Sequence, residues 1–188
     1  MSYPFEYRQN YIKDKGKYNL EALKRVISFN YDMIQVPRHG KTEYVQEQRG
    51  TCWLADDGLT FEYSGKSMKP QKIPELVNEI KKQIEKEFGI KFSGMLVNYY
   101  PDGKSSMGYH SDPIEDKWDN KFIVISFGDT RNFVFREIEN KDNKISYEFK
   151  DGDLIYMFDN CQEKFEHSVR KKKVDGGERI SIVFKKRI

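Results

Sequence analysis

The sequence predicts an α+β fold, in which helices buttress one sheet of an antiparallel, jelly-roll-like β-sandwich or barrel. Three observations predict it. Two amphipathic helical patterns lie in the first half of the chain, six or seven short strand patterns follow residue 89, and turn signals separate those strands. Alternating βαβ units would instead place a helix between successive strands.

Length and composition set the limits of this fold. The chain has 188 residues, suits one domain, and carries a net charge of +3. Aromatic residues make up 14% of it and apolar runs recur, which excludes extensive disorder. No apolar run approaches the ~18 residues of a membrane span, and no signal segment is evident at the start. We therefore expect an intracellular protein, nuclear or cytoplasmic, that is monomeric and makes no membrane contact.

The first predicted helix follows a segment, residues 1–18, that reads as an N-terminal extension. Asn19 is a suitable N-cap, and the next residues form an apolar stripe at helical spacing: Leu20, Leu23, Val26 and Ile27. The sequence thus predicts a single domain over residues 19–188.

A second helix is predicted between Pro74 and Gly89. Proline favours a helix start and glycine a helix end. Between them apolar residues recur at three- and four-residue spacing: Val77, Ile80, Ile84 and Phe88. Between the two helices, residues 53–65 predict a strand-turn-strand unit around Asp57-Gly58.

The predicted strands after Gly89 are short and separated by turns, as at residues 139–142. They cover residues 94–100, 121–127, 132–138, 144–149, 153–158, 166–169 and 179–187. Cys52 and Cys161 are too far apart in the chain to indicate a disulfide framework, so both are interpreted as buried small apolar residues.

Two of the three histidines lie among these strands. In His110-Ser111-Asp112 one residue separates the imidazole from the carboxylate, which places both on the same side of an extended chain. Joined by His167 from a distant strand, they form the two-histidine, one-carboxylate set that leaves open positions on Fe(II). Zinc is an alternative metal, and a surface turn at Asp112-Pro113 is the alternative structure.

The last strand alternates between polar and apolar residues. Its polar side carries Arg179, Ser181, Val183, Lys185 and Arg187. The strand is either an edge strand with a solvated face or an inward-facing strand whose cations hold a dianionic acid. Asn98 and Tyr100 share one side of an earlier strand and are candidates to hydrogen-bond the same acid.

Taken in order, these segments resemble the AlkB family of Fe(II)- and 2-oxoglutarate-dependent dioxygenases. The resemblance runs from about Arg49 to Lys186. Its motifs are residues 98–103, 107–112, 126–137, 167–169 and 179–185. Residues 56–65 and 69–80 are similar to the nucleotide-recognition region of the family's DNA-repair members.

The resemblance implies a double-stranded β-helix core over residues 94–188 and a nucleotide-recognition lid over residues 49–72. It implies that His110, Asp112 and His167 bind Fe(II). The residues it assigns to 2-oxoglutarate are Asn98, Tyr100, Arg179, Ser181 and Lys185. The implied reaction consumes dioxygen and 2-oxoglutarate and hydroxylates an N-methyl group, which leaves as formaldehyde.

The implied partner is DNA or RNA with N-alkylated bases. A base inside a duplex must be extruded to reach a buried metal, and the lid aromatics Phe61 and Tyr63 are expected to hold it. Arg49 and Ser64 belong to the same lid. The basic residues Arg170, Lys171 and Lys172, with Lys173, form either a solvated loop or a track of phosphate contacts.

Three positions of the final motif depart from the family pattern, with Ser181, Val183 and Lys185 in place of Asn, Thr and Arg. Lysine keeps the charge but loses the bidentate geometry, for which Arg187 is a candidate replacement. Repair members carry an acidic residue two positions after the His-x-Asp pair, where this chain has Ile114. Two alternatives therefore stay open: an oxygenase of a protein or small molecule, and a nucleic-acid-binding module with a decayed site.

Overall fold

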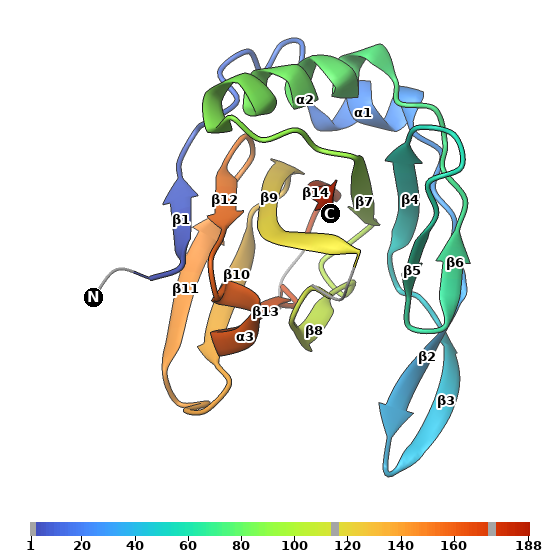
Figure 1. Ribbon diagram of the computed structural model, residues 1–188, viewed down its shortest axis with the longest axis vertical. Coiled ribbons are helices and arrows are strands. Elements are labelled where there is room, and N and C mark those ends of the chain that lie inside the picture. Colours follow the sequence, from blue (N-terminus) through green and yellow to red (C-terminus); the bar gives the residue numbers. More distant parts are fainter. Residues whose placement is uncertain (1–2, 114–116, 173–175) are drawn as a thin grey trace.

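Two antiparallel sheets face each other in the computed structural model, which describes residues 3–113, 117–172 and 176–188 (Figure 1). In spatial order the major sheet contains β1 (Phe5–Arg8), β12 (Leu154–Met157), β9 (Trp118–Gly128), β14 (Arg179–Arg187), β7 (Gly94–Tyr100) and β4 (Gly50–Ala55). The minor sheet contains β11 (Lys144–Phe149), β10 (Arg131–Glu137), β13 (Phe165–Val169) and β8 (Met107–His110). The predicted jelly-roll is confirmed.

Helix α1 (Leu20–Val26) begins at the predicted cap, since the Asn19 side chain accepts a hydrogen bond from the Ala22 amide at 3.0 Å. Leu23 and Ile27 of its predicted stripe are buried, but Val26 is 45% exposed. The prediction for Val26 was wrong because the helix ends there and the chain turns away into extended backbone.

Helix α2 (Glu75–Phe88) confirms both predicted ends. Pro74 precedes it, and Gly89 closes it in the left-handed region at φ 65°. Its buried side chains Val77, Ile80 and Ile84 pack with the outer face of the major sheet. Figure 1 shows α1 and α2 lying together across that face. Within the described ranges, no helix is long and apolar enough to cross a membrane.

The strand-turn-strand prediction was right about the strands and wrong about their pairing. Strand β4 pairs with β7, while β5 (Phe61–Tyr63) pairs with β6 (Lys66–Met68). The β5–β6 turn occupies Ser64 and Gly65, both at positive φ, which glycine adopts without steric cost. The pairing follows from this tight turn, because it returns the chain directly along β5.

A second hairpin, β2 (Met33–Arg38) and β3 (Lys41–Gln46), was not predicted. It extends away from the body of the molecule in Figure 1. Its turn residues His39 and Gly40 both have positive φ. His-Gly is a weaker hairpin signal than Asn-Gly or Asp-Gly, and both strands are largely exposed, so neither turn chemistry nor hydrophobic alternation marked them.

The N-terminal segment is not a separate extension. Strand β1 pairs with β12 at the edge of the major sheet, and the ring of Phe5 stacks on that of Phe135 with centroids 3.8 Å apart. Strand β14 lies between β9 and β7, which rules out the edge-strand interpretation of its polar side. Its residues Arg179 and Lys185 are completely buried between the two sheets.

Both cysteines lie in the core, as predicted. Cys52 and Cys161 are 0% exposed, and burial raises the pKa of each thiol to about 12. Since the thiolate is the nucleophile, we expect neither cysteine of the native protein to react with a thiol reagent at about pH 8. Both are expected to react after denaturation, and a fast-reacting thiol in the native protein would contradict this packing.

Candidate metal and co-substrate site

Strand pairing brings the two histidines of the predicted set together. His110 ends β8 and lies opposite His167 of the neighbouring strand β13, with ring centroids 4.4 Å apart. Asp112 follows β8 by two residues. One candidate ligand atom from each of the three residues lies within 4.8 Å of the other two. The structure therefore places the predicted set at one point between the sheets.

The electrostatics of this point suit a divalent cation. Burial lowers the pKa of His110, and it lowers the pKa of His167 to about 3, so both imidazoles are neutral and keep a free lone pair. Burial alone would raise the pKa of the Asp112 carboxyl, but the Lys185 ammonium outweighs it and holds that pKa below its usual range. Two neutral imidazoles and one carboxylate fit Fe(II).

Neighbouring groups orient the candidate ligands. His110 Nδ1 lies 2.9 Å from the Gly108 carbonyl oxygen, which only accepts, so Nδ1 carries the proton and Nε2 is free for a metal. The Asp112 amide donates to Gln162 Oε1 at 2.7 Å, and the Ser111 hydroxyl donates to the Phe165 carbonyl at 3.1 Å. Gln162 belongs to the short helix α3 (Cys161–Lys164), which no sequence pattern marked.

Lys185 contacts the candidate metal ligands directly. Its Nζ lies 2.8 Å from Asp112 Oδ1, and it stands 4.2 Å from the centre of the Phe122 ring. The lysine that departs from the family motif is thus a buried partner of Asp112. Arg187 does not replace the missing arginine, because a register shift after Lys185 leaves it exposed outside the site.

We expect Lys185→Met to lower the unfolding free energy of the metal-free protein by about 3 kcal/mol, since it leaves the buried Asp112 carboxylate without its cation. Mn(II) should restore part of this loss by neutralising the same carboxylate. Urea denaturation with and without Mn(II) measures both values. The matched control Lys186→Met removes a partly exposed lysine 3.0 Å from Asp119 and should change stability little. If Lys185→Met lowered the unfolding free energy equally with and without Mn(II), the pairing of Lys185 with Asp112 would be contradicted.

Arg179 offers the clearest anion-binding group. Its Nε donates to Ser126 Oγ at 2.8 Å, while Nη1 and Nη2 are buried and have no partner among the described residues. Buried N–H groups without a partner are rare in proteins. The two atoms fit a bidentate carboxylate such as one end of 2-oxoglutarate.

Three other candidate co-substrate residues lie near Arg179 on β14 or on the neighbouring strand β7. Its guanidinium carbon lies 5.1 Å from the centre of the Tyr100 ring. Ser181, two residues further along β14, lies opposite Asn98 of β7. All four are buried on strands of the major sheet. Together with the orphaned Arg179 nitrogens, this polar set fits a small dicarboxylic acid.

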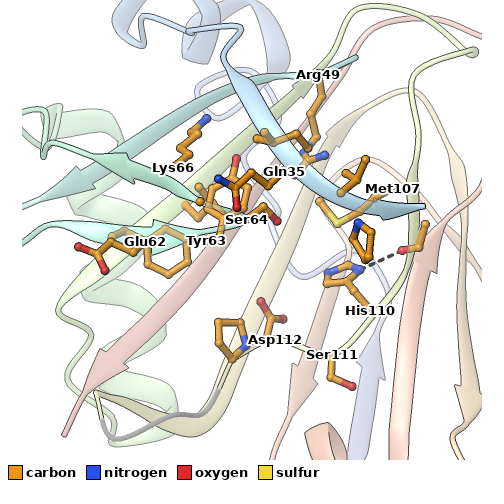
Figure 2. A pocket seen from close by; sticks show the side chains of 18 of the residues that line it. Gln35, Arg49, Glu62, Tyr63, Ser64, Lys66, Met107, His110, Ser111 and Asp112 are labelled. Atoms are coloured by element: carbon orange, nitrogen blue, oxygen red, sulfur yellow. Dashed lines mark hydrogen bonds between the residues drawn. The ribbon is translucent and has the colours of Figure 1, made fainter. Parts of the chain in front are cut away.

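A cavity of about 820 Å³ opens beside the candidate ligands, which is large enough for a nucleobase. Figure 2 shows Tyr63 on one side of it and His110 on the other. The lining also contains Arg49, Phe61 and Ser64 of the predicted lid. Phe61 is only 2% exposed and stacks on Trp53, so the half-buried Tyr63 offers more ring surface to the cavity.

The basic residues after β13 lie outside the lining of this cavity, although Arg170 packs on Tyr109, which lines it. Arg170, Lys171 and Lys172 do not line this cavity. The Lys172 ammonium pairs with Asp129 at 2.7 Å, and the Arg170 guanidinium lies 5.5 Å from the Tyr109 ring centre. Lys173 and the family departure at Ile114 fall outside the described residues.

The sequence analysis missed two charged residues at the cavity wall, Lys66, which lines the cavity, and Glu47 behind it. Glu47 and Lys66 are both buried, and they form an ion pair at 2.6 Å. Their neighbours in the chain carry no periodic or motif signal, because the pair joins a loop to a hairpin 19 residues away.

Known proteins share sequence and fold with this chain. The model of the 2OG-Fe(II) oxygenase superfamily matches residues 7–185. An uncharacterised protein of Acanthamoeba polyphaga mimivirus is 37% identical over 142 residues, which cover 75% of this chain and 74% of the viral protein. DNA oxidative demethylase ALKBH2 of Homo sapiens is 26% identical over 174 residues, which cover 88% of this chain and 66% of the human protein.

Two further matches are more distant or partial. Alpha-ketoglutarate-dependent dioxygenase alkB homolog 3 of Rattus norvegicus is 29% identical over 150 residues, covering 74% of this chain and 50% of the rat protein. The solved structure of OsALKBH1 matches with a TM-score of 0.67 and covers 99% of both chains at 14% identity. That structural likeness shows the fold.

Proposed function

Because this chain belongs to the 2OG-Fe(II) oxygenase superfamily, and within it to the AlkB family, we propose that it oxidatively demethylates N-alkylated bases of DNA or RNA. Enzymes of this superfamily use Fe(II), 2-oxoglutarate and dioxygen. The named relatives are a DNA oxidative demethylase and an alpha-ketoglutarate-dependent dioxygenase. The chain spans 66% and 50% of these two proteins, so the nucleic-acid substrate is part of the proposal.

In the proposed site His110, Asp112 and His167 hold Fe(II), and Arg179 binds one carboxylate of 2-oxoglutarate with help from Asn98, Tyr100, Ser181 and Lys185. When bound, the iron, 2-oxoglutarate and dioxygen supply the oxidation of an N-methyl group to N-hydroxymethyl, which leaves as formaldehyde. The protein's own residues bind the reactants, orient them and exclude water. The co-substrate residues and His167 are buried on strands of the two sheets, which holds them in place.

One observation carries the nucleic-acid proposal: the cavity beside the candidate ligands has an aromatic wall opposite them. Tyr63 and His110 line opposite sides, so a planar base that enters between them lies next to the metal position. Arg49 lines the same cavity and brings a guanidinium close to the base or its phosphate. A base can reach this depth only when it is extruded from its stack.

Tyr63→Ala is expected to weaken binding of a methylated oligonucleotide about 5- to 150-fold, because aromatic stacking contributes about 1–3 kcal/mol per base. Fluorescence anisotropy with a labelled oligonucleotide measures it. Tyr31→Ala serves as the control, since Tyr31 is 45% exposed and does not line the cavity. Equal affinities of the Tyr63 variant and the wild type would contradict the assignment of Tyr63.

The function itself is tested by loading the protein with Fe(II) and 2-oxoglutarate without oxygen, then adding air and methylated single- or double-stranded DNA or RNA. Formaldehyde release from at least one oligonucleotide is expected. Decarboxylation of 2-oxoglutarate that no oligonucleotide stimulates would point to a protein or small-molecule substrate. Salt-dependent nucleic-acid binding that is indifferent to iron and 2-oxoglutarate would point to a decayed site.

A further inference from the structure

A carboxylate that the proposed reaction does not use lies behind the wall of the substrate cavity. The Glu47 side chain, between β3 and β4, is 0% exposed. Its Oε1 accepts a hydrogen bond from the Tyr63 hydroxyl at 2.5 Å, and its Oε2 accepts one from the Lys66 ammonium at 2.6 Å. Arg49 Nη2 lies 3.4 Å from Oε1. These three donors, together with the Thr51 hydroxyl 3.4 Å from Oε2, fix this carboxylate.

The charges around Glu47 balance. The Lys66 ammonium also reaches Asp32 Oδ2 at 2.8 Å and Thr51 Oγ1 at 2.7 Å. With Arg49, two cations face two carboxylates. A buried ion pair such as Glu47 with Lys66 stabilises a fold no better than well-packed apolar residues of similar volume, and removing one member is costly. Unlike an apolar cluster, however, these ion pairs fix the orientation of the hydrogen-bond donors and acceptors around them.

Arg49 connects these ion pairs to the proposed 2-oxoglutarate site. Its Nε donates to Asn98 Oδ1 at 3.0 Å. A guanidinium has no acceptor, so the amide oxygen of Asn98 must face it and the amide nitrogen must point away. Among the described residues, no acceptor bonds that nitrogen. Asn98 thus keeps two N–H donors for an oxygen of 2-oxoglutarate.

Tyr63 connects the same ion pairs to the proposed base site. Its hydroxyl is held by Glu47, and the Lys66 ammonium lies 5.1 Å from the centre of its ring. A ring fixed at its hydroxyl end and over one face loses little further freedom when a base stacks on it. The Tyr63 wall of the cavity is therefore already in place before substrate binds.

We propose that Glu47 is a positioning residue that prepares both binding sites, the base site through Tyr63 and the 2-oxoglutarate site through Arg49 and Asn98. The inference rests on the proposed function for the base site. It goes beyond that function because it assigns the preparation of two sites to one carboxylate that touches neither reactant.

The test is Glu47→Gln, which keeps the shape of the side chain but replaces one acceptor by an N–H₂ donor facing other donors. Mn(II) takes the place of Fe(II) so that no turnover occurs. Calorimetry measures 2-oxoglutarate binding, and fluorescence anisotropy measures binding of a methylated oligonucleotide. Each affinity is expected to fall about tenfold, while Mn(II) affinity stays within about twofold of the wild type.

Two further variants separate positioning from stability. The double variant Glu47→Leu with Lys66→Leu removes the buried ion pair together, so it should fold while both affinities fall. Glu85→Gln is the matched control, since Glu85 is a buried carboxylate paired with Lys81 and Lys91 on the far side of the major sheet. It should lower the melting temperature and leave both affinities unchanged.

Affinities within about twofold of the wild type in either folded Glu47 variant would overturn the inference, and so would the loss of only one of the two affinities. If the wild type shows no preference for a methylated oligonucleotide, the proposed function fails instead. The 2-oxoglutarate measurement then decides the inference through Arg49 and Asn98.

Discussion

Replacing Asp112 with alanine is expected to lower 2-oxoglutarate-dependent formaldehyde release by at least about a thousandfold, equal to roughly 4 kcal/mol of activation free energy. The change removes the one carboxylate of the candidate metal set and leaves the buried Lys185 without its partner at 2.8 Å. His110→Ala should have a similar effect, because it leaves only two of the three candidate metal ligands. Formaldehyde assays and Mn(II) calorimetry measure activity and metal binding separately.

Asp142→Ala is the matched control for Asp112→Ala, because Asp142 is an exposed aspartate in the turn between β10 and β11. It should leave both activity and metal binding unchanged. The assignment of the metal ligands would be wrong if Asp112→Ala or His110→Ala turned over substrate at the wild-type rate.

The second large effect is expected at Arg179. Its guanidinium is completely buried, and although burial lowers its pKa to about 10, it is still protonated at neutral pH. Arg179→Met removes Nη1 and Nη2, the two nitrogens that have no hydrogen-bond partner among the described residues. We expect the KM for 2-oxoglutarate to rise about 30- to 5,000-fold, since truncating one partner of a buried charge pair costs about 2–5 kcal/mol.

Steady-state kinetics at varied 2-oxoglutarate measure this KM. Arg187→Met is the control on the same strand, because Arg187 is exposed and lies outside the site. Its KM should equal that of the wild type. An unchanged KM in Arg179→Met would show that the orphaned nitrogens do not bind the co-substrate.

Most strands after Gly89 were predictable because each is a local pattern bounded by turns, but β8 (Met107–His110) lies outside the predicted ranges. Strands β7, β11 and β14 coincide with their predicted ranges. The candidate metal set was predictable for the same reason, since His110 and Asp112 are two residues apart. The burial of Arg179 was left open by the sequence, because only the place of β14 between β7 and β9 distinguishes an inward face from an edge.

The unpredicted features depend on contacts between distant segments. Strand β1 is held by β12, almost 150 residues away in the chain. The pairing of β5 with β6 depended on a turn at Ser64-Gly65, where the sequence instead suggested pairing across Asp57-Gly58. Glu47 and Gln162 have no local sequence signal, because their roles depend on contacts with distant residues. Glu47 accepts from Tyr63 of the β5–β6 hairpin, and Gln162 of helix α3 accepts from the Asp112 amide.

The most direct test of the proposed function is the simultaneous measurement of succinate and formaldehyde from one methylated oligonucleotide and from its unmethylated counterpart. We expect succinate and formaldehyde in equal amounts from the methylated oligonucleotide, with neither product stimulated by the unmethylated one. Succinate that forms at the same rate with both oligonucleotides, without formaldehyde, would contradict the proposal that this protein demethylates nucleic-acid bases.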